Sequence, residues 1–163
     1  MLTPADLAAY IAEHRIRAEL LPMREDTPTV ADAARVLGVS PDQIVKSVVF
    51  LVDDRPHLVI ANGSRRISQG RLAALFGLGK KRVRLASPEV ALDATGYPVG
   101  AMPPFGHVTP LPTLLDRHVL AQEEVFAGGG GIDYLLRIAP EELLRATRAQ
   151  VVEVTEESDG HAI

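Results

Sequence analysis

One lysine lies inside a run of large apolar residues, and these surroundings make it a candidate for chemistry. Residues 44–52 read Ile-Val-Lys-Ser-Val-Val-Phe-Leu-Val, with turn-forming residues at 40–42 and 53–56. The β-branched content predicts a buried strand that is apolar on both faces. Burying an unpaired ammonium is costly, so Lys46 must reach water, meet an anion or lose its proton.

Two explanations of Lys46 stay open. A pocket that receives an anionic or carbonyl-bearing ligand would satisfy the ammonium. Alternatively, the stem of Lys46 lies along the sheet while its charged head extends into solvent, as lysine stems commonly do. The residues alone do not choose between a functional and a merely solvated lysine.

A second candidate is the loop Gly100-Ala101-Met102-Pro103-Pro104-Phe105-Gly106. Glycine lets the backbone approach a ligand, and proline holds the loop rigid, which would aim amide N–H groups at one point. Such donors stabilise an oxyanion by roughly 3 kcal/mol each. A packed, proline-rich surface turn is the alternative. The glycines of 128–131, taken alone, are read as a mobile turn.

Basic residues gather in one stretch. Seven basic residues lie between positions 65 and 84, and this stretch has no acidic residue. The net charge of the whole chain is −4, so the rest of the chain carries −4 − 7 = −11. A locally positive region on an acidic protein suits a polyanion such as nucleic acid. A solvated surface helix and loop explains the stretch equally well. The seven are Arg65, Arg66, Arg71, Lys80, Lys81, Arg82 and Arg84.

Several kinds of chemistry are excluded or disfavoured. The chain has no cysteine, which rules out thiol catalysis and cysteine-ligated metal. Its five histidines are scattered without a metal-ligand spacing, so we expect no metal and no cofactor. A phosphate-binding loop and a G-x-S-x-G nucleophile elbow are both missing. Any hydrolysis would therefore use neither a serine triad nor a metal.

Composition and length indicate an ordinary globular protein. With 163 residues, 47% of them hydrophobic and 23% charged, the chain can bury a core as one domain, which we place at 1–155, followed by a polar tail at 156–163. The N-terminus lacks the pattern of a signal peptide, and no run of roughly 18 apolar residues occurs. We therefore expect a cytoplasmic protein without a membrane partner.

Local patterns predict an α+β fold with a mixed, largely antiparallel, barrel-like sheet and flanking helices. The segments 44–52 and 57–61 should form a hairpin, 97–112 an irregular loop, and 113–120 stays ambiguous. Capping residues, prolines and glycines predict helices at 4–14, 30–37, 88–95 and 140–146, and one that starts at Ser68 and ends at Gly77 or Gly79. Further strands are predicted at 15–21, 83–86, 123–127, 132–138 and 150–154.

These features together resemble the YbaK/prolyl-tRNA synthetase-associated domain family, deacylases that edit mischarged tRNA. The resemblance rests on five features, which follow the family's order and cover nearly the whole chain. They are the segments 29–39 and 43–47, the G-x-x-x-P element Gly100 to Pro104 with Gly106, Asp116, and the glycine turn that leads to Ile132-Asp133. The resemblance implies the fold of that family.

The resemblance also implies roles. Lys46 would be the functional lysine of the pocket, and other residues would bind the substrate near its acyl group: Ser47, Gly100, Ala101, Pro104, Gly106, Gly129, Gly130 and Asp133. The candidates for contacting tRNA are Arg65, Arg66, Lys80, Lys81 and Arg82. Residues 128–131 stand where alanine-specific relatives carry a histidine-containing motif, which makes this chain look nearer the cysteine-type or less defined members.

The implied activity is hydrolysis, in trans, of the ester on mischarged tRNA, namely a proline tRNA that carries cysteine, alanine or a similar small amino acid. The implied partners are mischarged tRNA and either prolyl-tRNA synthetase or the elongation machinery. A synthetase pocket separates side chains that differ by a methylene by only about 1 to 3 kcal/mol, so a second hydrolytic site is useful.

The chemistry asks little of the protein, because an aminoacyl ester is already activated. Two unit charges about 4 Å apart interact by roughly 4 kcal/mol at an effective dielectric near 20, enough for Lys46 to orient a phosphate. The alternative role for Lys46 is to polarise the ester. No side chain stands out as a general base, so the ribose hydroxyl, amine or thiol of the substrate would assist the attack. Two alternatives remain: a tRNA- or nucleotide-binding module without turnover, and a small-ligand regulatory protein.

Overall fold

A computed structural model describes residues 1–24, 27 and 29–158. Its α-helices are α1 (Pro4–Glu13), α2 (Val30–Leu37), α3 (Gln69–Leu75), α4 (Pro88–Thr95) and α5 (Pro140–Thr147). Three short 3-10 helices are η1 (Pro41–Gln43), η2 (Lys80–Arg82) and η3 (Arg117–Ala121). The strands are β1 (Ala18–Pro22), β2 (Val45–Val52), β3 (Arg55–Asn62), β4 (Arg65–Ile67), β5 (Val83–Leu85), β6 (Thr113–Asp116), β7 (Val125–Gly128), β8 (Tyr134–Ile138), β9 (Gln150–Val152) and β10 (Thr155–Glu157).

The strands form a five-stranded sheet in the order β5-β2-β3-β6-β9, a three-stranded sheet β1-β8-β7 and a two-stranded sheet β10-β4. All pairs are antiparallel except β3 with β6 and β6 with β9. The mixed, largely antiparallel α+β fold is thus confirmed. The barrel-like detail is not confirmed, because the described strands make three sheets and no closed barrel. A single bridge, Ile44 to Phe126, links the two larger sheets.

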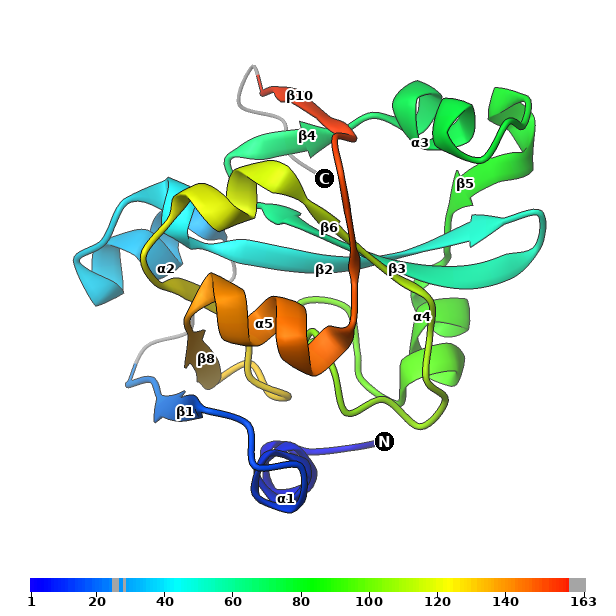
Figure 1. The fold of residues 1–163 in the computed structure, drawn as a ribbon. Helices are drawn as coiled ribbons and strands as arrows, with labels where there is room; N and C mark the ends of the chain where they lie inside the picture. Colours follow the sequence, from blue (N-terminus) through cyan, green and yellow to red (C-terminus); the bar gives the residue numbers. More distant parts are fainter. Residues whose placement is uncertain (25–26, 28, 159–163) are drawn as a thin grey trace.

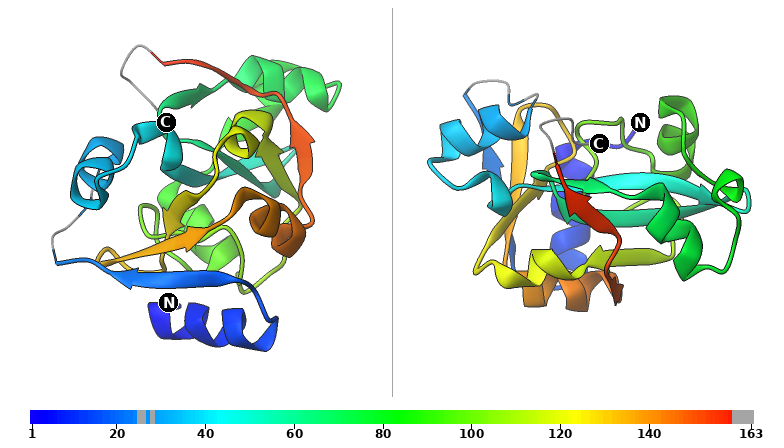
Figure 2. Two further views of the ribbon diagram at one scale, coloured as in Figure 1. Left: turned by 60° about the vertical axis from the view of Figure 1, so that its left-hand side comes forward. Right: turned by 90° about the horizontal axis from the view of Figure 1, so that it is seen from above.

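The β2–β3 hairpin separates two apolar cores (Figure 1). On one face, Val49 and Leu51 pack with residues of α1, α4, α5 and β8. On the other face, Phe50 and Val52 pack with residues of α3, β4 and β5. This burial on both sides explains the continuous apolar run in the sequence. Figure 2 shows α2 and α3 at opposite ends of the hairpin.

Helix ends follow the predicted caps. Thr3 and Asp6 form a capping box at α1, and Thr29, Ser68 and Ser87 cap later helices through their hydroxyls. Gly38 ends α2 with a positive φ of 69°, a conformation that favours glycine. The local signals were therefore sufficient to place the helices.

The sequence-based prediction differs from the structure at the C-terminal end. The strand predicted at 150–154 is confirmed only as β9, which ends at Val152. Strand β10 and its partner β4 were not predicted. The polar tail predicted at 156–163 therefore begins inside β10, and its residues 159–163 lie outside the described part of the chain. The ambiguous segment 113–120 forms β6 followed by most of η3.

Candidate active site

A pocket of about 160 Å³ lies at the N-terminal end of β2, and we call it the β2 pocket. It brings together α2, the first residues of β2, the loop after α4, and strands β7 and β8. Its lining residues thus come from segments more than 100 residues apart in the sequence. Its described lining residues are Thr27, Thr29, Val30, Ala33, Ile44, Val45, Lys46, Ser47, Gly100, Met102, Phe126, Ala127, Gly128 and Leu135.

The edge of β2 is open beside this pocket. Strand β5 pairs with β2 only from Phe50 to Val52. The carbonyl of Val49 accepts a hydrogen bond from the N–H of Ala86 on that side, and alternate residues of a strand point their backbone groups in the same direction. The backbone N–H of Ser47 therefore points to the open edge. Its hydroxyl oxygen is buried and lacks a hydrogen-bond partner among the described residues.

Lys46 lines the same pocket, but its side chain leaves β2 on the opposite face from Ser47. Its Nζ donates a 2.8 Å hydrogen bond to the backbone carbonyl of Arg65. Burial lowers the pKa of Lys46 to about 8, because the charged form loses hydration. The half-buried ammonium, which has three donor positions, thus has a neutral partner, and no second partner of it is found among the described residues.

Two glycine segments build one wall of the β2 pocket. Gly100 has a φ of +93°, which favours glycine, while a Cβ there would meet nothing within 4 Å. At Gly128 the opposite holds, since a Cβ would lie 2.1 Å from the carbonyl oxygen of Met102. The N–H of Gly130 also donates to the carbonyl of Ala101 at 2.8 Å. The glycine turn therefore clamps the loop that carries Gly100.

The residues predicted to bind substrate do not all meet. Ser47 and Gly100 line the β2 pocket with Lys46, whereas Ala101, Gly129 and Gly130 are buried behind its wall. Pro104 and Gly106 line another cavity of about 110 Å³, beside Tyr10 and His107. Asp133 is exposed, and its carbonyl accepts a hydrogen bond from the N–H of Met23.

Sequence reasoning missed the apolar wall of the β2 pocket. Phe126 and Leu135 lie in predicted strands, and Ala33 lies in a predicted helix, but their periodicity indicated only burial. In the structure they form a small apolar cluster with Ile44, and this cluster lines the β2 pocket. No local signal would have separated these residues from ordinary core positions.

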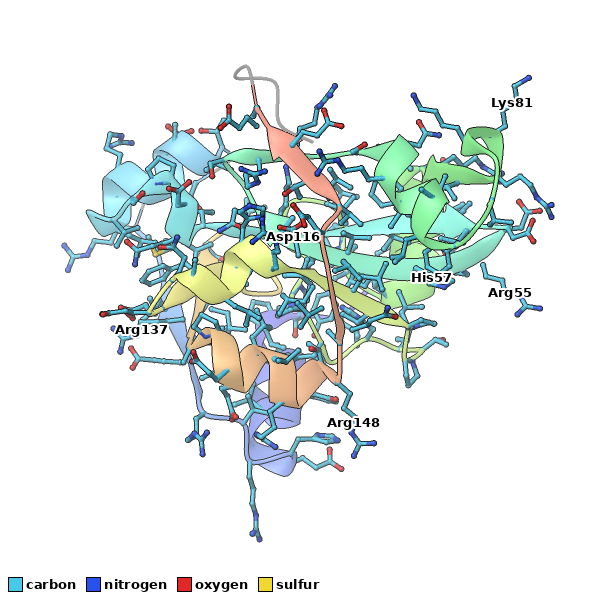
Figure 3. The ribbon with its side chains drawn as sticks, turned by 45° about the horizontal axis from the view of Figure 1, so that its top comes forward. Arg55, His57, Lys81, Asp116, Arg137 and Arg148 are labelled. Carbon is cyan, nitrogen blue, oxygen red and sulfur yellow. The ribbon has the colours of Figure 1, made fainter. Side chains whose placement is uncertain are left out.

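The candidate tRNA contacts form two groups. Arg65 binds Thr155 through Nε and Nη2, and Arg66 pairs with Glu156 at 2.9 Å, both close to the start of β2. Arg82 pairs with Asp53 at the hairpin turn. Lys80 and Lys81 make no ion pair with a described residue. The first group lies near the start of β2 and the second near its end, and the eight residues of β2 span about 24 Å. Figure 3 shows Lys81 at the outer end of the molecule, away from Asp116.

Among the described residues, no helix is long and apolar enough to cross a membrane. In the same part of the chain, no group of three or more histidine, cysteine or acidic side chains is arranged to hold a metal ion.

Comparison with known proteins identifies the family. The model of the aminoacyl-tRNA editing domain matches residues 24–146. A proline-tRNA ligase of Shouchella clausii (strain KSM-K16) is 33% identical over 109 residues, which make up 67% of this chain and 19% of that enzyme. The uncharacterized protein YwhH of Bacillus subtilis (strain 168) is 31% identical over 116 residues, 71% of this chain and 72% of YwhH.

Among solved structures, a proposed trans-editing enzyme for prolyl-tRNA synthetase has a TM-score of 0.85 at 34% identity, covering 94% of this chain and 96% of that one. This chain belongs to the aminoacyl-tRNA editing domain family, and the predicted relationship to YbaK and the prolyl-tRNA synthetase-associated domains is confirmed. It covers only 19% of the length of the Shouchella ligase.

Proposed function

We propose that this protein hydrolyses, in trans, the ester of mischarged tRNA, acting on a proline tRNA that carries cysteine, alanine or a similarly small amino acid. The observation that carries the proposal is the β2 pocket, where Lys46, Ser47 and Gly100 line one cavity. At about 160 Å³ it lies below the roughly 300–1,000 Å³ of drug-sized ligand sites. That size suits a small aminoacyl group.

The polar groups of the pocket suit two parts of such a substrate, a phosphate and the ester carbonyl. The ammonium of Lys46 anchors a phosphate of the terminal nucleotide, since no second partner of the ammonium is found among the described residues. The N–H of Ser47 at the open strand edge donates to the ester carbonyl, where charge develops during attack. The loop at Gly100 closes the pocket from the other side.

The described lining residues include no histidine, aspartate or glutamate. We therefore assign the attack to a water molecule that the substrate's own ribose hydroxyl, amine or thiol helps to activate. The protein contributes orientation and electrostatic stabilisation, which are strong effects in a partly desolvated site.

The walls of the pocket support a preference for small side chains. Val30, Phe126 and Leu135 provide apolar contact, and the unpartnered hydroxyl of Ser47 offers a hydrogen bond to a small polar group such as a thiol. Proline tRNA as the carrier is supported by the relatives, which include proline-tRNA ligases. A synthetase or elongation partner and a cytoplasmic location remain predictions.

The test is a deacylation panel with proline tRNA charged with cysteine, alanine, serine or proline. We expect turnover on at least one of the small non-cognate esters and little on the prolyl ester. A binding module without turnover, which the fused position of this domain in proline-tRNA ligases also suits, would instead protect the esters. A small-ligand protein would show no salt-dependent tRNA binding.

A further inference from the structure

A second pocket, of about 360 Å³, lies at the same end of the hairpin and shares no lining residue with the β2 pocket. It is formed where β3 ends, between η1, η3 and the end of β10. We call it the Asn62 pocket. Its described lining residues are Asp42, Asn62, Ser64, Arg65, His118, Ala121, Gln122, Glu157 and Ser158.

Asn62 is buried in the wall of this pocket with an unused acceptor. Its side chain is 2% exposed, and its Nδ2 donates a 2.6 Å hydrogen bond to the carbonyl of Asp42. Because a carbonyl can only accept, this bond fixes which end of the amide faces Asp42. The Oδ1 of Asn62 then lacks a partner among the described residues. Buried acceptors normally have a donor, so Asn62 Oδ1 is an acceptor that a ligand donor could satisfy.

His118 adds a second acceptor. Its Nδ1 lies 2.7 Å from the carboxylate of Asp116, which is fully buried and also accepts from Val154 and Thr155. Burial alone raises the pKa of Asp116, but the hydrogen bonds from Val154, His118 and Thr155 outweigh it and lower that pKa. An ionised carboxylate only accepts, so Nδ1 of His118 carries a proton, and in the uncharged form of the ring Nε2 is an acceptor.

The pocket thus combines acceptors with a cation at its border. Asp42 and Glu157 add carboxylates to the acceptors of Asn62 and His118. Arg65 spends Nε and Nη2 on Thr155, which leaves Nη1 for a ligand. The carbonyl of the same Arg65 holds the ammonium of Lys46, so this border adjoins the β2 pocket. A complementary ligand carries N–H donors together with an anionic group.

We propose that the Asn62 pocket binds the cytosine of the nucleotide that precedes the terminal adenosine of tRNA. This inference rests on the proposed function, which puts the terminal nucleotide at Lys46. Cytosine presents an exocyclic amine that donates to the acceptors of Asn62 and its neighbours, and the phosphate that joins this nucleotide to the terminal adenosine lies toward Arg65 and Lys46. Uracil has the same shape but presents a carbonyl oxygen where cytosine has the amine, and that oxygen would face acceptors.

The test uses the whole chain and two free nucleotides, cytidine and uridine 5′-monophosphate, titrated separately into isotope-labelled protein and followed by NMR. We expect the cytidine nucleotide to shift the signals of Asn62, His118 and Gln122 and to bind about tenfold more tightly than the uridine nucleotide. Equal affinities, or shifts confined to the β2 pocket, would overturn the inference.

Variants identify the groups responsible. Asn62→Leu keeps the size of the side chain but removes the acceptor, and it should abolish the preference for cytidine. Because a buried substitution can prevent folding, Glu157→Gln and His118→Gln, both at less buried sites, should each reduce the preference. The matched control is His57→Gln. His57 lies on β3, as Asn62 does, but at the far end of the hairpin (Figure 3), so this variant should leave the preference for cytidine unchanged. Unchanged preference in all three pocket variants would contradict the assignment.

A deacylation assay separates this inference from the proposed function. Mischarged tRNA with its penultimate cytidine replaced by uridine should be hydrolysed more slowly than the natural substrate, through a higher KM. If deacylation occurs but the free nucleotides bind equally, only the subsite fails. If no ester is hydrolysed while the cytidine preference holds, the proposed function fails and the nucleotide site stands.

Discussion

The Nζ of Lys46 donates a 2.8 Å hydrogen bond to the backbone carbonyl of Arg65. Arg65, which borders the Asn62 pocket, therefore also holds Lys46, the candidate functional residue of the β2 pocket. Because the carbonyl is neutral, it positions the ammonium without cancelling its charge. A charge held in this way can attract a phosphate at the boundary of the two pockets.

Replacing Lys46 tests that charge directly. Lys46→Met keeps much of the apolar stem and removes the ammonium, so we expect kcat/KM for deacylation to fall about 100-fold, the scale of losing one positioned electrostatic group. Single-turnover kinetics with mischarged tRNA measure this loss. Arg55→Met removes an exposed cation at the other end of β3 and should act like the parent chain. Full activity of Lys46→Met would refute the role of the ammonium.

The depressed pKa of Lys46 predicts a pH profile. The ammonium loses its proton as pH rises through about 8. We therefore expect the ratio of catalysed to uncatalysed hydrolysis to fall above that pH. Lys46→Arg should lower the overall rate but move the fall to higher pH, since a guanidinium stays charged. A flat ratio from pH 7 to 10 in the parent chain would count against an essential cation.

The same shift affects stability with a definite sign. Between about 8 and the ordinary lysine pKa of 10.5, the unfolded chain holds a proton that the folded chain has released. The free energy of unfolding should therefore rise over this window because of Lys46, and the cost of burying the ammonium applies in full below it. The rise should be well under about 3 kcal/mol, because the side chain is partly solvated. Urea denaturation of Lys46→Met should lack this contribution.

Local chemistry explains how much of this fold and site was predictable. Capping hydroxyls, prolines and glycines act within a few residues, so the helices and the β2–β3 hairpin followed from the sequence. The β2 pocket depends on Ile44 meeting Phe126, and β4 depends on Arg66 lying opposite Glu156 on β10. Such contacts join residues that are distant in the sequence, so they leave no periodic signal. In addition, β4 has only three residues, which is too short for an alternating pattern to be recognised.

The same reasoning explains the division of the proline-rich loop. Gly100 and Pro104 are close in sequence and were expected to border one substrate. The chain between them is buried at Met102, which packs in the core below β2. The loop therefore presents Gly100 to one cavity and Pro104 to another.

Gly100 offers a test with an internal control. Gly100→Ala and Gly77→Ala both place a Cβ at positive φ, 93° and 66°, and in neither case would it meet an atom within 4 Å. Each should cost about 1 kcal/mol of stability from backbone strain alone. Only Gly100→Ala should also reduce deacylation, because only Gly100 lines the β2 pocket. Equal activity losses in the two variants would assign the effect to stability.

Glu142 should make stability sensitive to acid. Its side chain is 2% exposed, and it accepts hydrogen bonds from Arg145 and from the backbone of Arg17. The hydrogen bond from Arg145, aided by Arg17, lowers the pKa of Glu142 to about 2. The stabilisation is thus present above about pH 4.5 and is lost as pH falls toward 2.

Glu142→Gln should accordingly cost about 1–3 kcal/mol at pH 7, the scale of charge-assisted hydrogen bonds to a buried group. The difference from the parent chain should shrink below pH 4.5, which denaturation at a series of pH values would detect. Glu141→Gln, at the exposed neighbouring position, is the control and should change little. A difference that is constant with pH would show that the charge of Glu142 is irrelevant.

The second group of basic residues, Lys80, Lys81 and Arg82, lies near the turn of the β2–β3 hairpin. Lys80 and Lys81 make no ion pair with a described residue, whereas Arg82 is neutralised by Asp53. If this corner contacts the acceptor stem, Lys80→Ala with Lys81→Ala should weaken tRNA binding and lower the slope of log K against log salt by about 2, since each phosphate contact contributes nearly one unit. Arg82→Ala should lower it less. Fluorescence binding across a salt series measures both, and an unchanged slope in the double variant would remove Lys80 and Lys81 from the tRNA-binding surface.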